Sequence, residues 1–357
     1  MQWLTLHYLA GLRELGVEGF WLDILGPPKA GVKRSTEEAV EDFRARCERL
    51  GLHEHWAVLY NQQKVFGMAE RQLEALCGDS LLLVNLCGAL KQDELLRRFR
   101  RRAYFDLDPG FTQIWALEWD MDLSKHNIFF TVGLNVGKTD FPIPLRGIEW
   151  QTFVPPVALE YWPAQSDVTA AKFTTVGQWR GQSAVWNGEG YWPKREEFLR
   201  VIELPRKTAQ PIELALLIHE SESEDLSVLC NNGWRMVDPH EAAGGADGIR
   251  AYIQRSRAEF SVAKHGYVKS KSGWFSDRTV CYLASGRPVL VQDTGIGRHL
   301  PVGRGLLTFS TIDEALQGIQ SINGDYAGHC AAARKLAEER FAAPKVLQSI
   351  LERAGVL

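Results

Sequence analysis

The chain has 357 residues, of which 45% are hydrophobic and 24% charged, a composition typical of a soluble globular protein of about two domains. Its 41 Lys and Arg residues nearly balance 44 Asp and Glu residues, and the resulting charge of −3 argues against broad electrostatic binding to nucleic acid or anionic membranes. No apolar run approaches the roughly 20 residues that a membrane span needs.

The cysteines and the first residues indicate a cytoplasmic protein. The six cysteines are scattered, and no two stand at the close spacing of a metal site, so we expect reduced thiols in the core. Met1 is followed by an amphipathic segment that carries His7 and Arg13, not by basic residues and an apolar run. We therefore expect no signal peptide.

The N-terminal half is predicted to alternate helices and strands. Apolar residues at helical spacing fill the first segment, Gly16 stands at its predicted C-cap, and Ser35 with Glu38 forms a predicted capping box for the second helix. The expected elements are a helix over 3–15, a strand over 20–24, a helix over 35–50, and strands over 80–85, 102–106 and 127–132.

The order of these elements is unusual at its start. A doubly wound domain opens with a strand and a glycine-rich turn, whereas this chain opens on the helix that follows them. Two explanations remain open: the true start lies upstream, or the N-terminal sheet lacks its usual first strand.

Prolines between 142 and 163 interrupt regular structure, and the predicted domain boundary falls there, giving a first domain over 1–150 and a second over 151–335. The second domain is expected to contain strands over 173–176, 212–218, 234–237, 260–262 and 289–291, with helices over 194–204, 248–257 and from 277. Strands that alternate with helices predict an α/β fold of two doubly wound, Rossmann-like domains with parallel sheets.

A candidate phosphate site lies in the second domain. After the strand near 261, a polar loop leads to a helix that begins at Asp277 with Ser276 as its N-cap. The N-terminus of such a helix offers unpaired N–H groups and the positive end of the helix dipole, which favour phosphate. Lys264 adds a mobile charge, Gly273 allows close backbone approach, and Arg278 opposes the dipole, which indicates an anion nearby.

This loop and helix, with the following run over 283–291, resemble the donor half of GT-B-fold glycosyltransferases of the retaining type. The resemblance implies that Asp277 stands where the family has a glutamate for the ribose, and that Arg278, Lys264 and Arg180 contact the diphosphate. It also implies that the last helix, over 336–357, crosses back to the first domain. The predicted donor-binding residues are Arg180, Lys264, His265, Gly273, Ser276, Asp277, Arg278, Asp293, Thr294 and Gly295.

The acceptor is expected on the first domain, where Asp106 and Asp108 follow a predicted strand. Either carboxylate is a candidate to deprotonate or orient an acceptor hydroxyl, and the alternative is that they cap the turn before Pro109. Asn85 and Asn135 stand at similar strand ends with weaker claims. The Asp-x-Asp pairs at 106–108 and 120–122 match metal-dependent, single-domain sugar transferases, but the two-domain organisation fits that class poorly, so no metal or other cofactor is predicted.

The sequence thus predicts a cytoplasmic, metal-independent glycosyltransferase that uses a nucleotide-diphosphate sugar and a small-molecule, glycan or natural-product acceptor, without nucleic acid or a membrane span. Two alternatives remain open: a non-catalytic nucleotide-sugar-binding scaffold of the same fold, and a nucleotide-sugar epimerase. A nicotinamide dehydrogenase is disfavoured because no predicted strand leads into a GxGxxG turn.

Overall fold

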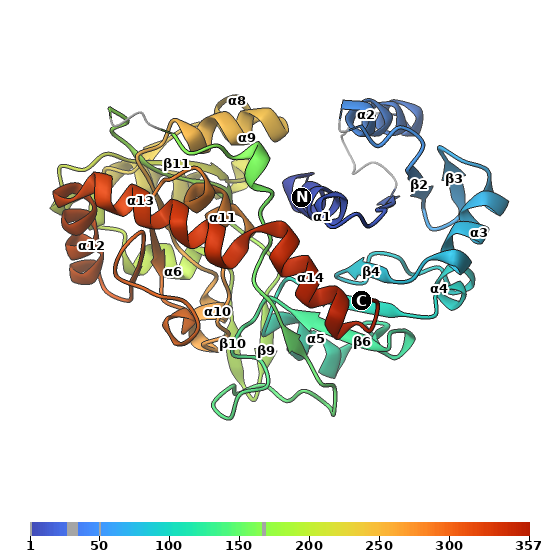
Figure 1. The fold of residues 1–357 in the computed structure, drawn as a ribbon. Helices are drawn as coiled ribbons and strands as arrows, with labels where there is room; N and C mark the ends of the chain where they lie inside the picture. The colour runs from blue at the N-terminus through green and yellow to red at the C-terminus, as the bar shows by residue number, and fades with distance from the viewer. Residues whose placement is uncertain (1, 27–34, 50, 166–168) are drawn as a thin grey trace.

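The computed structural model describes residues 2–26, 35–49, 51–165 and 169–357, which form a mixed α/β fold (Figure 1). The elements of the first half are α1 (Gln2–Glu14), β1 (Trp21–Leu25), α2 (Thr36–Arg49), β2 (Trp56–Tyr60), β3 (Lys64–Phe66), α3 (Glu70–Asp79), β4 (Leu83–Leu86), α4 (Asp93–Arg98), β5 (Arg102–Asp106), α5 (Phe111–Glu118), η1 (Leu123–Lys125), β6 (Ile128–Thr131) and β7 (Gln151–Thr152).

The first half carries two sheets. In one, β1 and β2 are parallel and β3 returns antiparallel beside β2; in the other, β4, β5, β6 and β7 are all parallel and lie in chain order. The predicted strand over 102–106 is confirmed to the residue, and β7 extends the second sheet two residues past the predicted boundary at 150. Strands β2 and β3 and helix α3 were not predicted.

Helix α2 begins where its capping residues predict. The backbone N–H of Glu38 donates to the Ser35 hydroxyl (3.1 Å), and the N–H of Ser35 donates to the Glu38 carboxylate (2.8 Å). These two bonds satisfy backbone donors that a helix N-terminus otherwise leaves unpaired, so the predicted capping box is confirmed.

The elements of the second half are η2 (Leu159–Tyr161), β8 (Phe173–Gln178), β9 (Ala184–Trp186), β10 (Glu189–Tyr191), α6 (Arg195–Arg200), η3 (Leu204–Lys207), β11 (Ile212–Leu217), η4 (Glu220–Glu222), α7 (Ser223–Asn231), β12 (Arg235–Met236), α8 (Pro239–Ala243), α9 (Gly245–Gln254), β13 (Ala258–Ser261), α10 (His265–Lys269), α11 (Asp277–Ala284), β14 (Val289–Gln292), η5 (Ile296–Arg298), β15 (Leu306–Phe309), α12 (Ile312–Gly324), α13 (Tyr326–Leu336), η6 (Ala337–Phe341) and α14 (Ala343–Arg353).

Six parallel strands form one sheet in the order β12-β11-β8-β13-β14-β15, and helices cover its faces. Its centre is apolar, since Phe173, Leu214, Phe260 and Leu290 are all fully buried. Chain order reverses between β8 and β13, and open α/β sheets bind ligands at the carboxyl ends of the strands at such a point. The topology therefore places the candidate site at the ends of β8 and β13.

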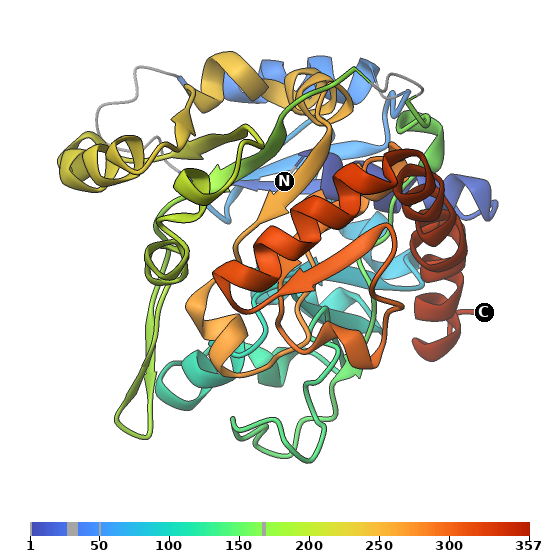
Figure 2. The same ribbon diagram turned by 90° about the vertical axis from the view of Figure 1, so that its left-hand side faces the viewer.

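Two features connect the halves. Figure 1 shows the red helices α13 and α14 running from one half to the other, and α14 packs against α1 through a cluster that includes Leu4, Tyr8 and Leu347. The β9–β10 hairpin extends from the second half toward α5 (Figure 2), where the Trp115 indole donates to the Ser183 carbonyl (3.3 Å). No helix in the described part of the chain has the length and apolarity to cross a membrane.

Candidate functional site

The candidate site lies where β8, β13 and β14 end and α11 begins. Because parallel strands end at one edge of the sheet, residues far apart in the chain meet there. The Ser276 hydroxyl caps α11 by accepting the N–H of Arg278 (3.2 Å). A cavity of about 10 Å³, room for a single water, adjoins this cap. It is lined by Ser261, Ala263, Trp274, Phe275, Ser276, Thr279, Val291 and Gln292.

Lys194 is the most unusual charged residue of this region. It occupies the N-cap position of α6, and only 9% of it is exposed. Its ammonium group forms no hydrogen bond and no ion pair with any residue that the structure describes. Burial, followed by the nearby Arg278 guanidinium, lowers the pKa of Lys194 from 10.5 to about 7. The charges of Glu259 and Asp277 act in the opposite direction. A largely buried lysine without a hydrogen-bonded anion is costly, which points to an anionic ligand.

Lys194 belongs to a cluster of three cations. A Cβ atom placed on Gly177, in β8, would lie 3.7 Å from Lys194 Nζ and 3.5 Å from Arg278 Nη1, so both cations border the same glycine. The Lys264 ammonium is close enough to lower the Lys194 pKa further. Arg278 is paired with Glu259 and Lys264 with Asp108, so Lys194 is the member of this cluster that has no ion-pair partner among the described residues.

Arg278 is held inside the protein. Its Nε donates to Glu259 (2.7 Å), and its two other nitrogens donate to the Val176 carbonyl and the Ser261 hydroxyl (both 2.8 Å). The Arg278 side chain is 14% exposed and that of Glu259 is fully buried. The structure thus supplies an anion for Arg278 inside the protein, Glu259, and a contact of Arg278 with a donor phosphate stays a prediction.

Lys264 joins the two halves. Its ammonium donates to Asp108 (2.5 Å), and the Tyr267 hydroxyl donates to the same carboxylate. The Lys264 ammonium also lies over the rings of Phe111 (5.2 Å) and Tyr267 (5.3 Å). The Asp108 side chain is 31% exposed, so it remains within reach of a ligand.

Asp106 needs correction as a candidate catalytic residue. It is fully buried, and its two oxygens accept bonds from the side chains of Thr112 (2.7 Å), Gln113 (3.0 Å) and Thr131 (2.7 Å) and from the N–H of Asp108 (2.9 Å). Burial raises the pKa of Asp106, and these four bonds act in the opposite direction. Because no acceptor can reach it, Asp106 positions the turn that presents Asp108.

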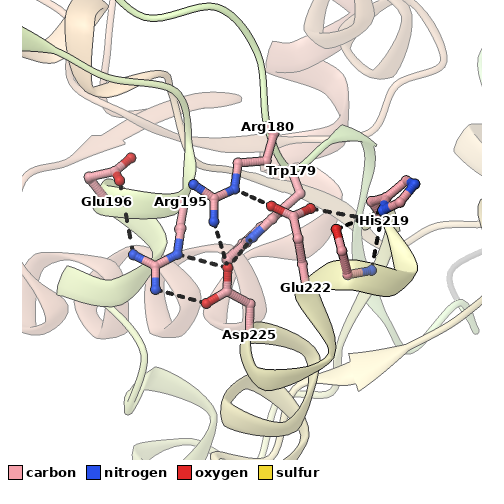
Figure 3. Close-up of polar contacts among 8 residues, drawn as sticks. Trp179, Arg180, Arg195, Glu196, His219, Glu222 and Asp225 are labelled. Atoms are coloured by element: carbon pink, nitrogen blue, oxygen red, sulfur yellow. Dashed lines mark hydrogen bonds and ion pairs between the residues drawn. The ribbon is translucent and has the colours of Figure 1, made fainter.

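Arg180, two residues past the carboxyl end of β8, pairs with two acidic residues. Figure 3 shows it between Glu222 and Asp225, and its Nη2 lies 3.4 Å from the Asp225 carboxylate. Asp225 also accepts two bonds from Arg195 (2.7 and 2.8 Å) and one from the Trp179 indole (2.9 Å). With two carboxylates beside it, the guanidinium of Arg180 has partners of its own, and the predicted contact with a diphosphate is not supported by its position.

The predicted glycines lie in a contact between the two halves. The N–H of Gly273 donates to Thr294 (2.8 Å), its carbonyl accepts from Leu134 (3.3 Å), and the Asn135 amide donates to the carbonyls of Lys271 (2.7 Å) and Gly295 (3.2 Å). Gly273 and Gly295 have φ values of +71° and +88°, which favour glycine. These predicted donor residues thus hold the first domain against the second.

The other predicted residues take varied positions. Asp277 is exposed in the first turn of α11, while Thr294 is buried and donates to the Trp274 carbonyl (2.7 Å). Asp293 accepts the N–H of Gly295 (2.8 Å). His265 begins α10, its Nδ1 lies 3.3 Å from the N–H of Trp192, and burial lowers its pKa.

A substitution at Gly273 tests the contact between the halves. A Cβ there would lie 2.8 Å from the Asn135 backbone nitrogen, whereas Gly188 has a similar φ of +75° with no atom within 4 Å. We expect Gly188→Ala to lower the free energy of unfolding by about 1–2 kcal/mol through backbone strain. Gly273→Ala should cost about 1–3 kcal/mol more because of the clash. Urea unfolding of both variants measures the difference, and equal losses would contradict a tight contact.

Lys194 is the residue that sequence reasoning missed. It stands at the start of a predicted helix, where a cation opposes the helix dipole, and the same argument had singled out Arg278. The described residues contain no group of three His, Cys, Asp or Glu side chains arranged to hold a metal ion.

No protein-family model and no curated protein matches the sequence, but solved structures match the fold. An alpha-glucosyltransferase in complex with UDP and a 13-mer DNA aligns over 99% of this chain and 95% of its own, with a TM-score of 0.61 and 9% identity. Anabaena HepE in complex with UDP and glucose aligns over 95% and 100% (TM-score 0.55, 13% identity), and TarM over 82% and 59% (TM-score 0.52, 14% identity). The chain thus has the GT-B glycosyltransferase fold, as its sequence resemblance predicts.

Proposed function

We propose that the protein transfers a sugar from a nucleotide-diphosphate sugar to an acceptor hydroxyl. The observation that carries this proposal is Lys194, a largely buried lysine that has no hydrogen-bond or ion-pair partner among the described residues and lies near the guanidinium of Arg278, from the first turn of α11. Structures of the same fold hold UDP, or UDP with glucose, which supports a nucleotide-sugar donor. All six cysteines are free thiols, which supports the proposed cytoplasmic location.

In the proposed reaction, the bond between the anomeric carbon and the diphosphate breaks, and a bond from the acceptor oxygen to that carbon forms. Lys194 and the N–H groups at the start of α11 stabilise the charge that develops on the departing diphosphate. Asp108, partly exposed and held by Lys264 and Tyr267, takes the proton of the acceptor hydroxyl or orients it.

We propose that this reaction needs no metal ion. Lys194 and Lys264 come from two elements, and the helix dipole of α11 adds positive potential between them. Together they supply the positive charge that a divalent cation supplies elsewhere.

Donor binding requires movement at the cap of α11. The cavity there holds about 10 Å³, which is far too small for a diphosphate. The Lys264–Asp108 ion pair and the contacts of Gly273 with the first domain close the region. We propose that the halves separate to admit the donor and close again over it, the motion expected of a two-domain enzyme.

A thermal-shift titration tests donor binding. We expect UDP or another nucleoside diphosphate to raise Tm, since a ligand at 100 times its Kd stabilises the folded state by about 2.7 kcal/mol. Sodium sulfate at the same ionic strength controls for unspecific anion effects. A screen of UDP, GDP, ADP and TDP and their glucose derivatives without any shift beyond sulfate would contradict the proposal.

A non-catalytic nucleotide-sugar-binding protein is the second candidate. It is favoured by the acceptor side of the site, where Asp106 is buried and Asp108 is already bound by Lys264 and Tyr267. An assay for nucleotide release from a bound nucleotide sugar, with water or an added sugar as acceptor, distinguishes the two functions, because only the transferase releases the nucleotide. Tight binding without any turnover favours the binding protein.

A further inference from the structure

The β9–β10 hairpin is a short element that leads directly to Lys194. Its strands are antiparallel, and Asn187 and Gly188, the two residues of its turn, have φ values of +50° and +75°. An Asn-Gly turn with positive φ at both positions matches the twist of the flanking strands, so the local sequence sets the geometry of the hairpin. Beyond β10, Trp192 and Pro193 complete the connection to Lys194, the N-cap of α6.

One face of the hairpin docks on the first half, beside α5 (Figure 1). Ala184 and Tyr191, a cross-strand pair, are buried in one hydrophobic cluster with Trp115 of α5. The Trp115 indole also donates to the Ser183 carbonyl. Side chains alternate between the two faces of a strand, so Val185 points to the opposite face, where it is 49% exposed. The hairpin thus belongs to the second half in sequence, while one of its faces packs against the first half.

The base of the hairpin is bonded to the start of α10. Two backbone hydrogen bonds, of 3.1 and 3.2 Å, join residues 192–193 to residues 265–266. The Lys269 ammonium of α10 also donates to a carbonyl of β10 (3.0 Å). Lys194 directly follows the first of these segments, and Lys264 directly precedes the second. The base of one hairpin therefore places both lysines of the candidate site.

We propose that the docked hairpin positions Lys194. While Ala184, Tyr191 and Trp115 are packed together, Lys194 keeps its largely buried place beside Arg278. When the two halves separate, the hairpin loses its support on α5, its base moves, and the Lys194 ammonium gains access to water. Trp115 and Ala184 are therefore positioning residues, which act on a ligand only through Lys194.

Coupling of this kind acts in both directions. If docking of the hairpin places Lys194 for an anion, binding of the anion stabilises the docked hairpin by the same free energy. The first half then controls a cation of the second half, and an anion binds tightly only when the halves are closed. That this anion is the diphosphate of a nucleotide sugar rests on the proposed function, whereas the placement of Lys194 by the hairpin does not.

Labelling with trace acetic anhydride measures the placement of Lys194 in the full chain without a ligand. The reagent acetylates unprotonated amines, so mass spectrometry of the labelled peptides at several pH values gives the pKa of individual lysines. Ala184→Asp places a charge in the docked face, and Trp115→Ala weakens the same contact from the first half. Val185→Asp adds the same charge to the open face and is the matched control. Every variant keeps the charged groups that act on Lys194, which are Arg278, Lys264, Glu259 and Asp277.

We expect Lys194 to titrate near pH 7 in the wild type and in Val185→Asp, and at least one pH unit higher in Ala184→Asp and Trp115→Ala. The proposal is overturned if either docked-face variant folds and titrates like Val185→Asp, or if wild-type Lys194 titrates like the exposed Lys207. If Trp115→Ala does not fold, Ala184→Asp decides, because its new carboxylate reaches water once the hairpin is free. No nucleotide is present in this experiment, so failure of the wild type to bind UDP contradicts the proposed function alone.

Discussion

Replacing Lys194 by methionine is expected to remove most of the affinity for nucleoside diphosphates while leaving the free protein at least as stable as the wild type. The loss should be about 10- to 150-fold in Kd, the range for one hydrogen bond to a charged group. Methionine has a similar length without the charge, and the ammonium that it removes from this largely buried residue has no hydrogen-bond or ion-pair partner in the described chain. Isothermal titration calorimetry with UDP and urea unfolding measure the two effects.

A matched control for this variant is Lys207→Met, which removes a lysine that is 47% exposed and lies 4.0 Å from Glu203. It should change neither UDP affinity nor stability by a measurable amount, because exposed ion pairs contribute little. If Lys194→Met bound UDP as tightly as this control, Lys194 would have no role in the site.

Replacing Arg278 by methionine is expected to destabilise the fold by about 3–5 kcal/mol, the cost of breaking a buried ion pair. The substitution leaves the Glu259 carboxylate fully buried without its cation, and it also removes the donors to Val176 and Ser261. Urea unfolding monitored by tryptophan fluorescence measures the loss.

Two further variants sharpen this test. Glu259→Gln in the Arg278→Met background removes the buried carboxylate charge that has lost its partner, and it should restore part of the stability. Arg298→Met breaks an exposed pair with Asp140 and should cost no more than about 1 kcal/mol. An Arg278→Met protein as stable as the wild type would contradict a structural role for Arg278. Loss of UDP binding in the Arg278→Met, Glu259→Gln double variant would instead support the predicted contact of Arg278 with the donor.

The regular elements could be predicted where local signals were strong. The strand over 102–106 is an apolar run bounded by polar residues, and Ser35 with Glu38 marks the start of α2. The run Trp56–Tyr60 carries the same kind of signal and was overlooked, as was Leu306–Phe309. Apart from Thr308, the residues of both strands are apolar, and most of them are buried, so both strands were predictable from the sequence.

The site was harder to predict because tertiary contacts decide which of its charged residues pair with each other inside the protein. The dipole argument correctly required an anion near Arg278, but only the fold shows that the anion is Glu259, on the strand before. The burial of Lys194 depends in the same way on Gly177 and Arg278, which come from two other elements. Local sequence shows which cations oppose a helix dipole, and packing decides which of them has no partner within the protein and can bind a ligand.

The lowered pKa of Lys194 links its charge to pH. The folded pKa, about 7, lies below the ordinary 10.5, so between these values the unfolded chain binds more protons than the folded one. The contribution of Lys194 to stability therefore rises with pH across this window. Anion binding requires the charged form, so UDP affinity should fall about tenfold per pH unit above 7.

Proton uptake on UDP binding tests the central role of Lys194 most directly. At pH 8, calorimetric titrations in Tris and in HEPES, which differ in ionisation enthalpy, give the number of protons taken up per UDP. The account predicts that the wild type takes up most of one proton, because Lys194 is largely neutral in the free protein and charged beside the diphosphate. Lys194→Met should take up none. Wild-type binding without proton uptake, or equal uptake by the variant, would contradict the assignment of Lys194 as the buried cation of a diphosphate site.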